Sequence, residues 1–156
     1  AAEDAEGEDG GAKAAREERS EALGGLLERF KSVLGQSVSE VRLSRRLTES
    51  AACLVIPEGG LHAHVERLLR ANDPGMESQK RILEINPDHP LLEAMRSLHA
   101  HDPESPRVKT WIQVIHDQAL LTEGSPVDDP ATFAQRLTEL LQTAAERAVT
   151  ELADAS

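Results

Sequence analysis

The chain has 156 residues and a formal net charge of −11, because 28 acidic residues outnumber 17 basic ones. An acidic excess of this size disfavours binding to nucleic acid and to anionic membrane surfaces, since both need a basic footprint. The length suffices to bury the core of one domain, and with only 2% aromatic residues that core must be built from Leu, Val, Ile and Ala.

The first residues have the composition of a linker. Residues 1–11 contain five acids, no base and no large apolar side chain, so burial cannot offset the entropy lost on ordering. We therefore predict a disordered acidic linker over residues 1–18 and a single domain over residues 19–156. An acidic docking tail is the alternative interpretation. The absence of an initial Met suggests a fragment of a longer protein.

Helical and extended patterns then alternate along the chain. Apolar residues recur every three or four positions from Leu23 to Leu34, which predicts a helix that Gly35 ends. Strand character follows around Val41 and Leu43, across residues 51–56 and across residues 81–85. A second helix is predicted between the second and third strands, so these two strands could be parallel neighbours.

Three more helices are predicted in the second half. Asp88 is a plausible N-cap for the first of them. Apolar residues from Val108 to Ala119 mark one face of the next, which Gly124 and Pro126 end. Asp129 before Pro130 indicates the start of the last. The fold class is therefore α+β, with a small three-stranded sheet packed with helices. The last two helices should form an antiparallel pair, which can pack on its own sheet or make a four-helix bundle with a second copy.

Signals for catalysis or metal binding are weak. Cys53 is the only cysteine and lies in an apolar run, which favours a small buried thiol over a reactive nucleophile. Two pairs, His62 with His64 and His99 with His101, have ligand-type side chains, but residues two apart do not share a face on a helix. No phosphate-binding loop or nucleophile elbow is present. An unrelated small monomeric enzyme or regulator that binds metal through these pairs is the alternative function.

The location of the protein follows from what the sequence lacks. Its uninterrupted apolar stretches are shorter than the roughly 20 residues that a membrane-spanning helix needs. No signal peptide opens the chain. We therefore expect a cytoplasmic protein.

A family resemblance rests on several segments in a fixed order. They are Leu-Glu-Ile-Asn-Pro-Asp-His at residues 83–89, Leu-Thr-Glu-Ser at residues 47–50, Trp111 on a helix, and Asp-Gln-Ala-Leu-Leu at residues 117–121. Together they resemble the C-terminal domain of the HtpG chaperones, the bacterial branch of the ninety-kilodalton heat-shock family. The resemblance covers about Ser20 to Ala148, and its most specific segment is residues 83–89.

The resemblance implies a homodimerisation domain, since in this family the C-terminal domain joins two protomers. ATP and Mg belong to the family's N-terminal domain, so no cofactor and no catalytic residue are expected in this chain. The other partners it implies are unfolded or partly folded client proteins. The residues expected at the dimer interface lie on the last two helices: Trp111, Ile112, Ile115, Ala119, Phe133, Leu137, Leu140, Leu141 and Ala144.

The resemblance also implies a client-binding apolar stripe on the second helix, at Leu61, Val65, Leu68 and Leu69. The family often places Met on this helix, whereas this chain has Leu and Val there. The alternative is that the stripe packs on the sheet. The chain also lacks the acidic pentapeptide that ends the eukaryotic relatives, which favours a bacterial type.

Overall fold

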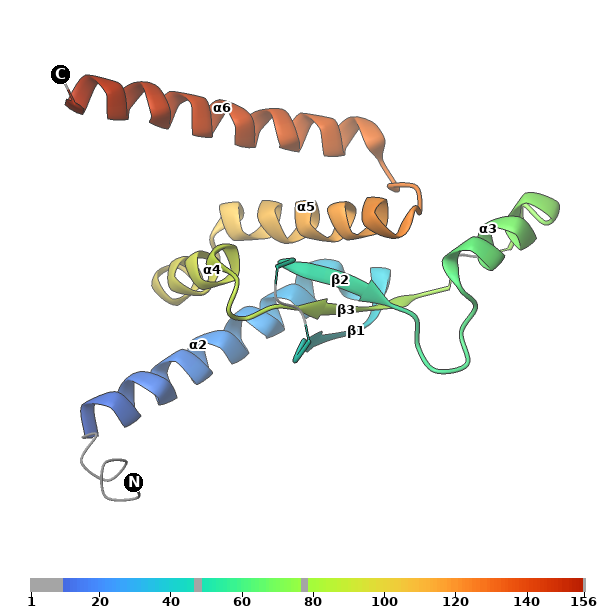
Figure 1. Cartoon of the computed structure of the whole chain (residues 1–156), viewed down its shortest axis with the longest axis horizontal. Helices are drawn as coiled ribbons and strands as arrows, with labels where there is room; N and C mark the ends of the chain where they lie inside the picture. Colours follow the sequence, from blue (N-terminus) through green and yellow to red (C-terminus); the bar gives the residue numbers. More distant parts are fainter. Residues whose placement is uncertain (1–9, 47–48, 77–78, 156) are drawn as a thin grey trace.

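The computed structural model describes residues 10–46, 49–76 and 79–155 and has an α+β architecture, as predicted (Figure 1). Most of the linker (residues 1–9) and part of the 47–50 segment lie outside the described residues. The elements in chain order are α2 (Gly10–Leu34), the short 3-10 helix η1 (Gly35–Ser37), β1 (Val38–Leu43), β2 (Ala52–Val55), α3 (Ala63–Asn72), β3 (Arg81–Ile85), α4 (Pro90–His101), α5 (Pro106–Glu123) and α6 (Pro130–Ala155).

Helix α2 begins earlier than the sequence pattern indicated. It starts at Gly10, so residues 10–18 are helical, although we predicted that they belong to a disordered linker. The apolar stripe that begins at Leu23 marks only the part of α2 that can pack on the domain. The preceding turns have no such stripe, and periodicity therefore gave no signal for them.

The sheet has the strand order β1-β3-β2, with β3 in the centre. β1 runs parallel to β3, whereas β2 runs antiparallel to it. The prediction that the second and third strands are parallel neighbours is therefore wrong. The reason is the position of α3, which lies beyond the end of the sheet (Figure 1). A parallel crossover must carry the chain back along the sheet, and α3 does not do so.

The core lies between one face of the sheet and helices α2, α4 and α5, as Figure 1 shows. Each of these helices contributes one apolar stripe, and β3 contributes the side chains of its inner face. Fully burying such a side chain stabilises the fold by about 1.5–3 kcal/mol. The largest fully buried side chains are Leu26, Phe30, Leu83, Ile85, Leu92, Met95, Val108 and Ile112.

The Asn-Pro-Asp-His segment forms the turn between β3 and α4. The N-cap of α4 is His89, whose Nδ1 accepts a hydrogen bond from the amide of Leu91 at 3.1 Å, so the prediction of Asp88 is wrong. The amide of Asp88 instead donates to Oδ1 of Asn86 at 3.1 Å. The side-chain amide of Asn86 also donates to the carbonyl of Ser50 at 3.2 Å. Asp88 is thus a residue of this turn, and His89, immediately before Pro90, holds the N-cap position.

The corner between α5 and α6 agrees with the sequence. Gly124 ends α5 with φ +84°, a left-handed conformation that glycine adopts without strain. Oδ1 of Asp129 accepts from the amide of Thr132 at 3.1 Å, which caps α6. The chain reverses here, so α5 and α6 run antiparallel (Figure 1), as predicted.

Candidate functional site

The described residues contain no group of three or more His, Cys, Asp or Glu side chains that could hold a metal ion. His62 occupies the N-cap position of α3 without a side-chain capping hydrogen bond, and His64 lies exposed on that helix. His99 lies at the contact of α4 with α2, where its Nε2 is 3.3 Å from the position a Cβ would take on Gly25, and His101 is exposed. The two pairs therefore lie on different helices and do not converge. Within the same ranges no helix is long and apolar enough to cross a membrane.

Helix α6 is the most exposed apolar element among the described residues. It runs for 26 residues and buries none of them. Four of its large apolar side chains keep between 41% and 73% of their surface exposed, and they are Leu137, Leu141, Val149 and Leu152. A contiguous exposed apolar stripe of this kind is uncommon unless it serves an interaction.

A groove of about 500 Å³ lies between α5 and α6. Trp111 forms part of its α5 wall, and Leu140 and Ala144 form part of its α6 wall. Polar and charged residues line the rest, including Glu139 and Arg147. The groove therefore joins the apolar stripe of α6 to a half-buried aromatic ring on α5.

Near the start of α6 a polar contact ties it to α5. Nη1 of Arg136 lies 3.8 Å from Oδ2 of Asp117. Burial raises the pKa of Asp117, while His116 and Arg136 oppose that shift. Burial also lowers the pKa of His116, although the neighbouring acids Asp117, Asp128 and Glu123 act in the opposite direction.

The residues expected at a dimer interface fall into two groups. Ile112, Ile115 and Ala119 lie in the core of this chain and are buried by its own sheet and helices. The others are exposed or half-buried, and they are Trp111, Phe133, Leu137, Leu140, Leu141 and Ala144. The second group can meet another molecule without rearrangement of the core.

Helix α3 stands apart from the core, beyond the end of the sheet (Figure 1). The apolar residues expected to bind clients are all exposed, by between 37% and 56% of their surface, and they are Leu61, Val65, Leu68 and Leu69. Leu61 precedes the first turn of α3, and the other three lie on the helix. This stripe does not pack on the sheet, which was the alternative interpretation.

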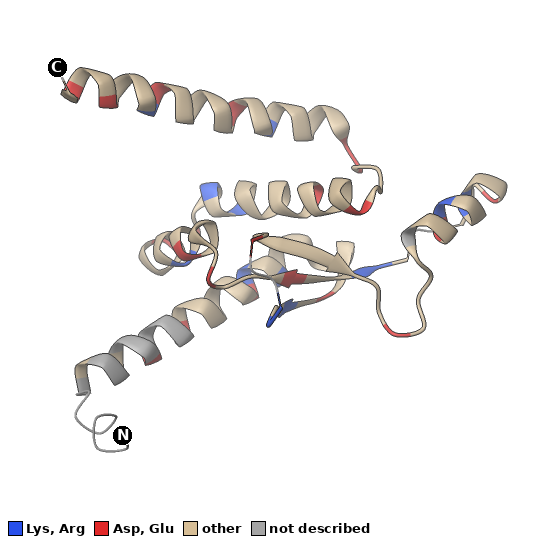
Figure 2. Ribbon diagram, in the orientation of Figure 1, with Lys and Arg blue, Asp and Glu red and all other residues tan. Residues whose placement is uncertain are grey.

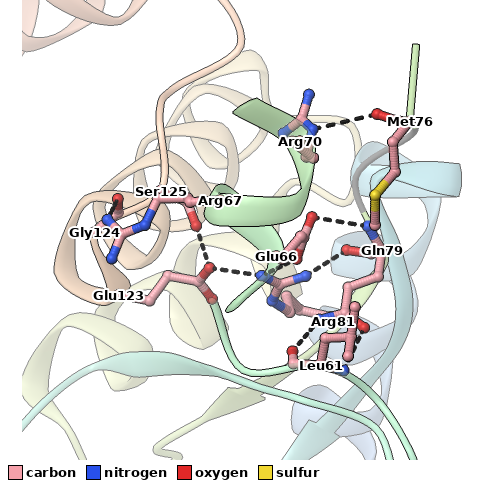
Figure 3. Close-up of polar contacts among 10 residues, drawn as sticks. All are labelled: Leu61, Glu66, Arg67, Arg70, Met76, Gln79, Arg81, Glu123, Gly124 and Ser125. Carbon is pink, nitrogen blue, oxygen red and sulfur yellow. Dashed lines mark hydrogen bonds and ion pairs between the residues drawn. The ribbon is translucent and has the colours of Figure 1, made fainter. Parts of the chain in front are cut away.

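Charged residues join α3 to the rest of the domain (Figure 3). Nη2 of Arg81, at the start of β3, lies 2.6 Å from Oε2 of Glu66 on α3 and 3.2 Å from Oε2 of Glu123 at the end of α5. Arg67 of α3 donates to the carbonyl oxygen of Gly124. Figure 2 shows basic residues on α3 and at the start of β3, and acidic residues toward the end of α5.

Our sequence analysis missed these contacts. A signal was present, because Arg81 opens a strand that is otherwise rich in apolar residues, and a buried Arg needs an acidic partner. The identity of the partners was not predictable, since Glu66 and Glu123 lie far from Arg81 in the sequence.

Comparison with known proteins gives a consistent match. The family model described as Hsp90 protein matches residues 2–156. The chain is 51% identical over 131 residues to the chaperone protein HtpG of Myxococcus xanthus and 50% identical over 129 residues to that of Geobacter metallireducens, covering 83% of this chain in both cases. It is 42% identical over 137 residues, or 88% of the chain, to HtpG of Mycobacterium avium. The matched segment spans only 20–21% of the length of these relatives.

Proposed function

The chain belongs to the Hsp90 family and is an HtpG-type chaperone domain, and from this premise we propose that it is the module that joins two chaperone protomers. The observation that carries the proposal is α6, an amphipathic helix of 26 residues that buries none of its side chains. The groove beside it provides apolar walls on both helices. An antiparallel helix pair that meets its own copy makes a four-helix bundle.

In such a dimer the interface is isologous, so the same residues of each protomer face one another across a two-fold axis. A stable interface of this type buries on the order of 1,200–2,000 Å² in total. The exposed stripe of α6, together with Trp111, supplies the apolar centre. Ile112, Ile115 and Ala119 contribute indirectly, because their packing in the core holds α5 in place on the sheet.

A permanent joint at this end of the chaperone raises the effective concentration of the distant ATPase domains. Their mutual contact is then intramolecular, so it can be weak and dependent on nucleotide. The domain itself would neither bind nor hydrolyse ATP, which with Mg belongs to the N-terminal domain of the family. Saturable nucleotide binding to this chain at low micromolar concentration would contradict that assignment. A cytoplasmic location fits this role.

The exposure of α3 favours a second role, in binding client proteins. Its apolar stripe is accessible in the folded chain and lies away from α6 (Figure 1). Partly folded polypeptides expose apolar side chains, which this stripe could cover by burial of apolar area. The exposed Leu and Val side chains supply the contact, in place of the flexible Met that suits promiscuous surfaces.

The solution mass of the chain tests the dimer. We expect light scattering to give twice the chain mass at micromolar concentration, and the same value after addition of a chelator. The alternative function, a monomer that binds metal through its His pairs, predicts the chain mass and a loss of stability in chelator. A monomer at all accessible concentrations would refute the proposed joint.

A further inference from the structure

Helix α3 is held in place in an unusual way. Its large apolar residues are exposed, so apolar packing does not fix its position. Among the residues of α3 whose burial is described, the buried one is instead charged, because Glu66 is only 2% exposed. The partner of Glu66 is Arg81, which is 5% exposed. The polarity of this helix is thus the reverse of the core helices, which turn apolar residues inward.

Buried ions destabilise a fold unless they are paired and hydrogen-bonded. Glu66 and Arg81 are paired and hydrogen-bonded, although Nε of Arg81 is buried without a hydrogen-bond partner among the described residues. Oε1 of Glu66 accepts from the backbone amide of Gln79 at 3.1 Å. Nη1 of Arg81 donates to the carbonyl of Gln79 at 2.6 Å, and Nη2 of Arg81 also contacts Glu123 at 3.2 Å. One guanidinium therefore links three elements, namely α3, β3 and α5 (Figure 3).

A second contact reaches the same corner. The guanidinium of Arg67 donates to the carbonyl oxygen of Gly124, the residue that ends α5. A Cβ on Gly124 would lie 2.7 Å from Nη1 of Arg67, and the φ of +84° also disfavours any other residue. Glu123, which contacts Arg81, and Gly124, which contacts Arg67, are consecutive residues immediately before the corner that leads to α6.

We propose that Glu66, Arg67, Arg81 and Glu123, which we name the α3 anchor, are positioning residues that fix the client-binding helix on the α5–α6 corner. The proposal rests on the client role of α3 proposed above. If apolar side chains held α3 in place, they would be buried against the domain and a client could not reach them. An anchor made of ions and hydrogen bonds leaves Val65, Leu68 and Leu69 free for a polypeptide that offers apolar side chains.

The anchor also sets the geometry of the chaperone. Because it ties α3 to the end of α5, the client surface keeps one orientation relative to the helix pair that makes the dimer. The two client surfaces of a dimer would then face fixed directions. A flexibly tethered α3 would present the same residues without a fixed direction, and its affinity for a client would include the entropy lost on ordering it.

Hydrogen exchange of α3 in the full-length chaperone tests the anchor without any client. We expect the amides of α3 to exchange about tenfold faster in the Arg67→Ala and Glu123→Ala variants, as for the loss of a charge-assisted contact. Arg67→Lys keeps a donor for the Gly124 carbonyl and should restore most of the protection. Peptides from α2 and α4, which contain no anchor residue, should exchange as in the wild type, which separates a local loosening from a general loss of stability.

Arg70→Ala is the matched control. Arg70 lies on the same helix, and its Nε donates to the carbonyl of Met76 at 3.3 Å, within the segment that follows α3. Truncation of Arg70 therefore removes a guanidinium from the same helix and leaves the contacts of the α3 anchor unchanged. Equal exchange of α3 in Arg67→Ala, Glu123→Ala and Arg70→Ala would overturn the proposal.

Binding of a carboxymethylated, permanently unfolded polypeptide to the same variants tests the consequence for clients. We expect Arg67→Ala and Glu123→Ala to weaken binding about three- to tenfold, as for the loss of pre-organisation. Faster exchange of α3 with unchanged binding would overturn the positioning role. A failure of the client role gives a different result from a failure of the anchor. If α3 does not bind clients, the double variant Leu61→Ser with Val65→Ser binds the polypeptide as the wild type does. The exchange of α3 tests the anchor independently, because it is measured without a client.

Discussion

Helix α5 buries Val108, Ile112 and Ile115 against the sheet and the neighbouring helices, whereas the adjacent helix α6 buries no residue at all. The two helices have the same kind of amphipathic sequence, they are joined by a short corner, and they run side by side (Figure 1). They differ in what lies opposite their apolar faces. For α5 it is the core of its own chain, and for α6 the chain supplies only the groove on one side.

This difference shows what the spacing of apolar residues along a helix can and cannot indicate. The spacing reports that one face of a helix leaves water, but it does not report which surface covers that face. A covered stripe contributes to the stability of the single chain, and an uncovered stripe contributes to assembly. Truncation of the same residue type should therefore give different results on the two helices.

The largest expected effect is on the free energy of unfolding. Ile112→Ala should lower it by about 2–5 kcal/mol, because Ile112 is fully buried and the truncation leaves a cavity. Leu141→Ala should change it by less than about 0.5 kcal/mol in the dissociated chain, since Leu141 is exposed there. Urea unfolding at low protein concentration measures both. Equal losses in the two variants would remove the distinction between α5 and α6.

The next effect concerns association. Leu141→Glu should weaken the proposed dimer at least about thirtyfold, because a charge without a partner enters the interface twice. The matched control is Gln135→Glu, which adds the same charge to an exposed position of α6 that does not share a face with Leu141. Analytical ultracentrifugation over a dilution series measures both dissociation constants. If both variants associate like the wild type, the stripe of α6 is not the interface.

A smaller effect is expected on α3. Leu61→Ser with Val65→Ser should shift the melting temperature by about 2 °C or less, because neither side chain is buried in the core. The same change should weaken binding of an unfolded polypeptide to the full-length chaperone. Calorimetry and fluorescence anisotropy give the two values. A large fall in melting temperature would place the stripe in a packed environment and remove the client role.

The smallest effect is a pH dependence from His116. Burial lowers the pKa of His116 in the folded chain below its usual value of 6.5. The unfolded chain therefore takes up a proton first as the pH falls, so the stabilising contribution is present above about pH 6.5 and is lost at lower pH. His116→Gln should reduce the slope of stability against pH between about 5 and 7. Urea unfolding at a series of pH values measures the slope, and an unchanged slope would exclude His116 as its source.

Much of the fold was predictable because local chemistry determines it. The three strands, the helix pair at the C-terminal end and the caps at Gly124 and Asp129 all follow from period and turn residues. The direction of β2 relative to β3 was not predictable, since it depends on α3 leaving the sheet instead of crossing it.

Some features of the candidate site were also predictable from the sequence and others were not. The stripes of α3 and α6 were visible in the sequence, because each is a repeat within one helix. The α3 anchor was not, because Arg81 meets Glu66 and Glu123 only after the chain has folded. Long-range ion pairs carry no periodic signal, and the sequence contains many other acids that could have been partners for Arg81.

Trp111 gives the molecule an optical property of its own. The chain contains one Trp and no Tyr, so its near-ultraviolet emission comes almost entirely from a single ring. That ring forms part of the wall of the groove between α5 and α6. The emission of an indole moves to longer wavelength when water reaches it, so the colour of the fluorescence reports how far this groove is filled. The proposed assembly of the unlabelled protein can therefore be followed in real time through the emission of this one ring.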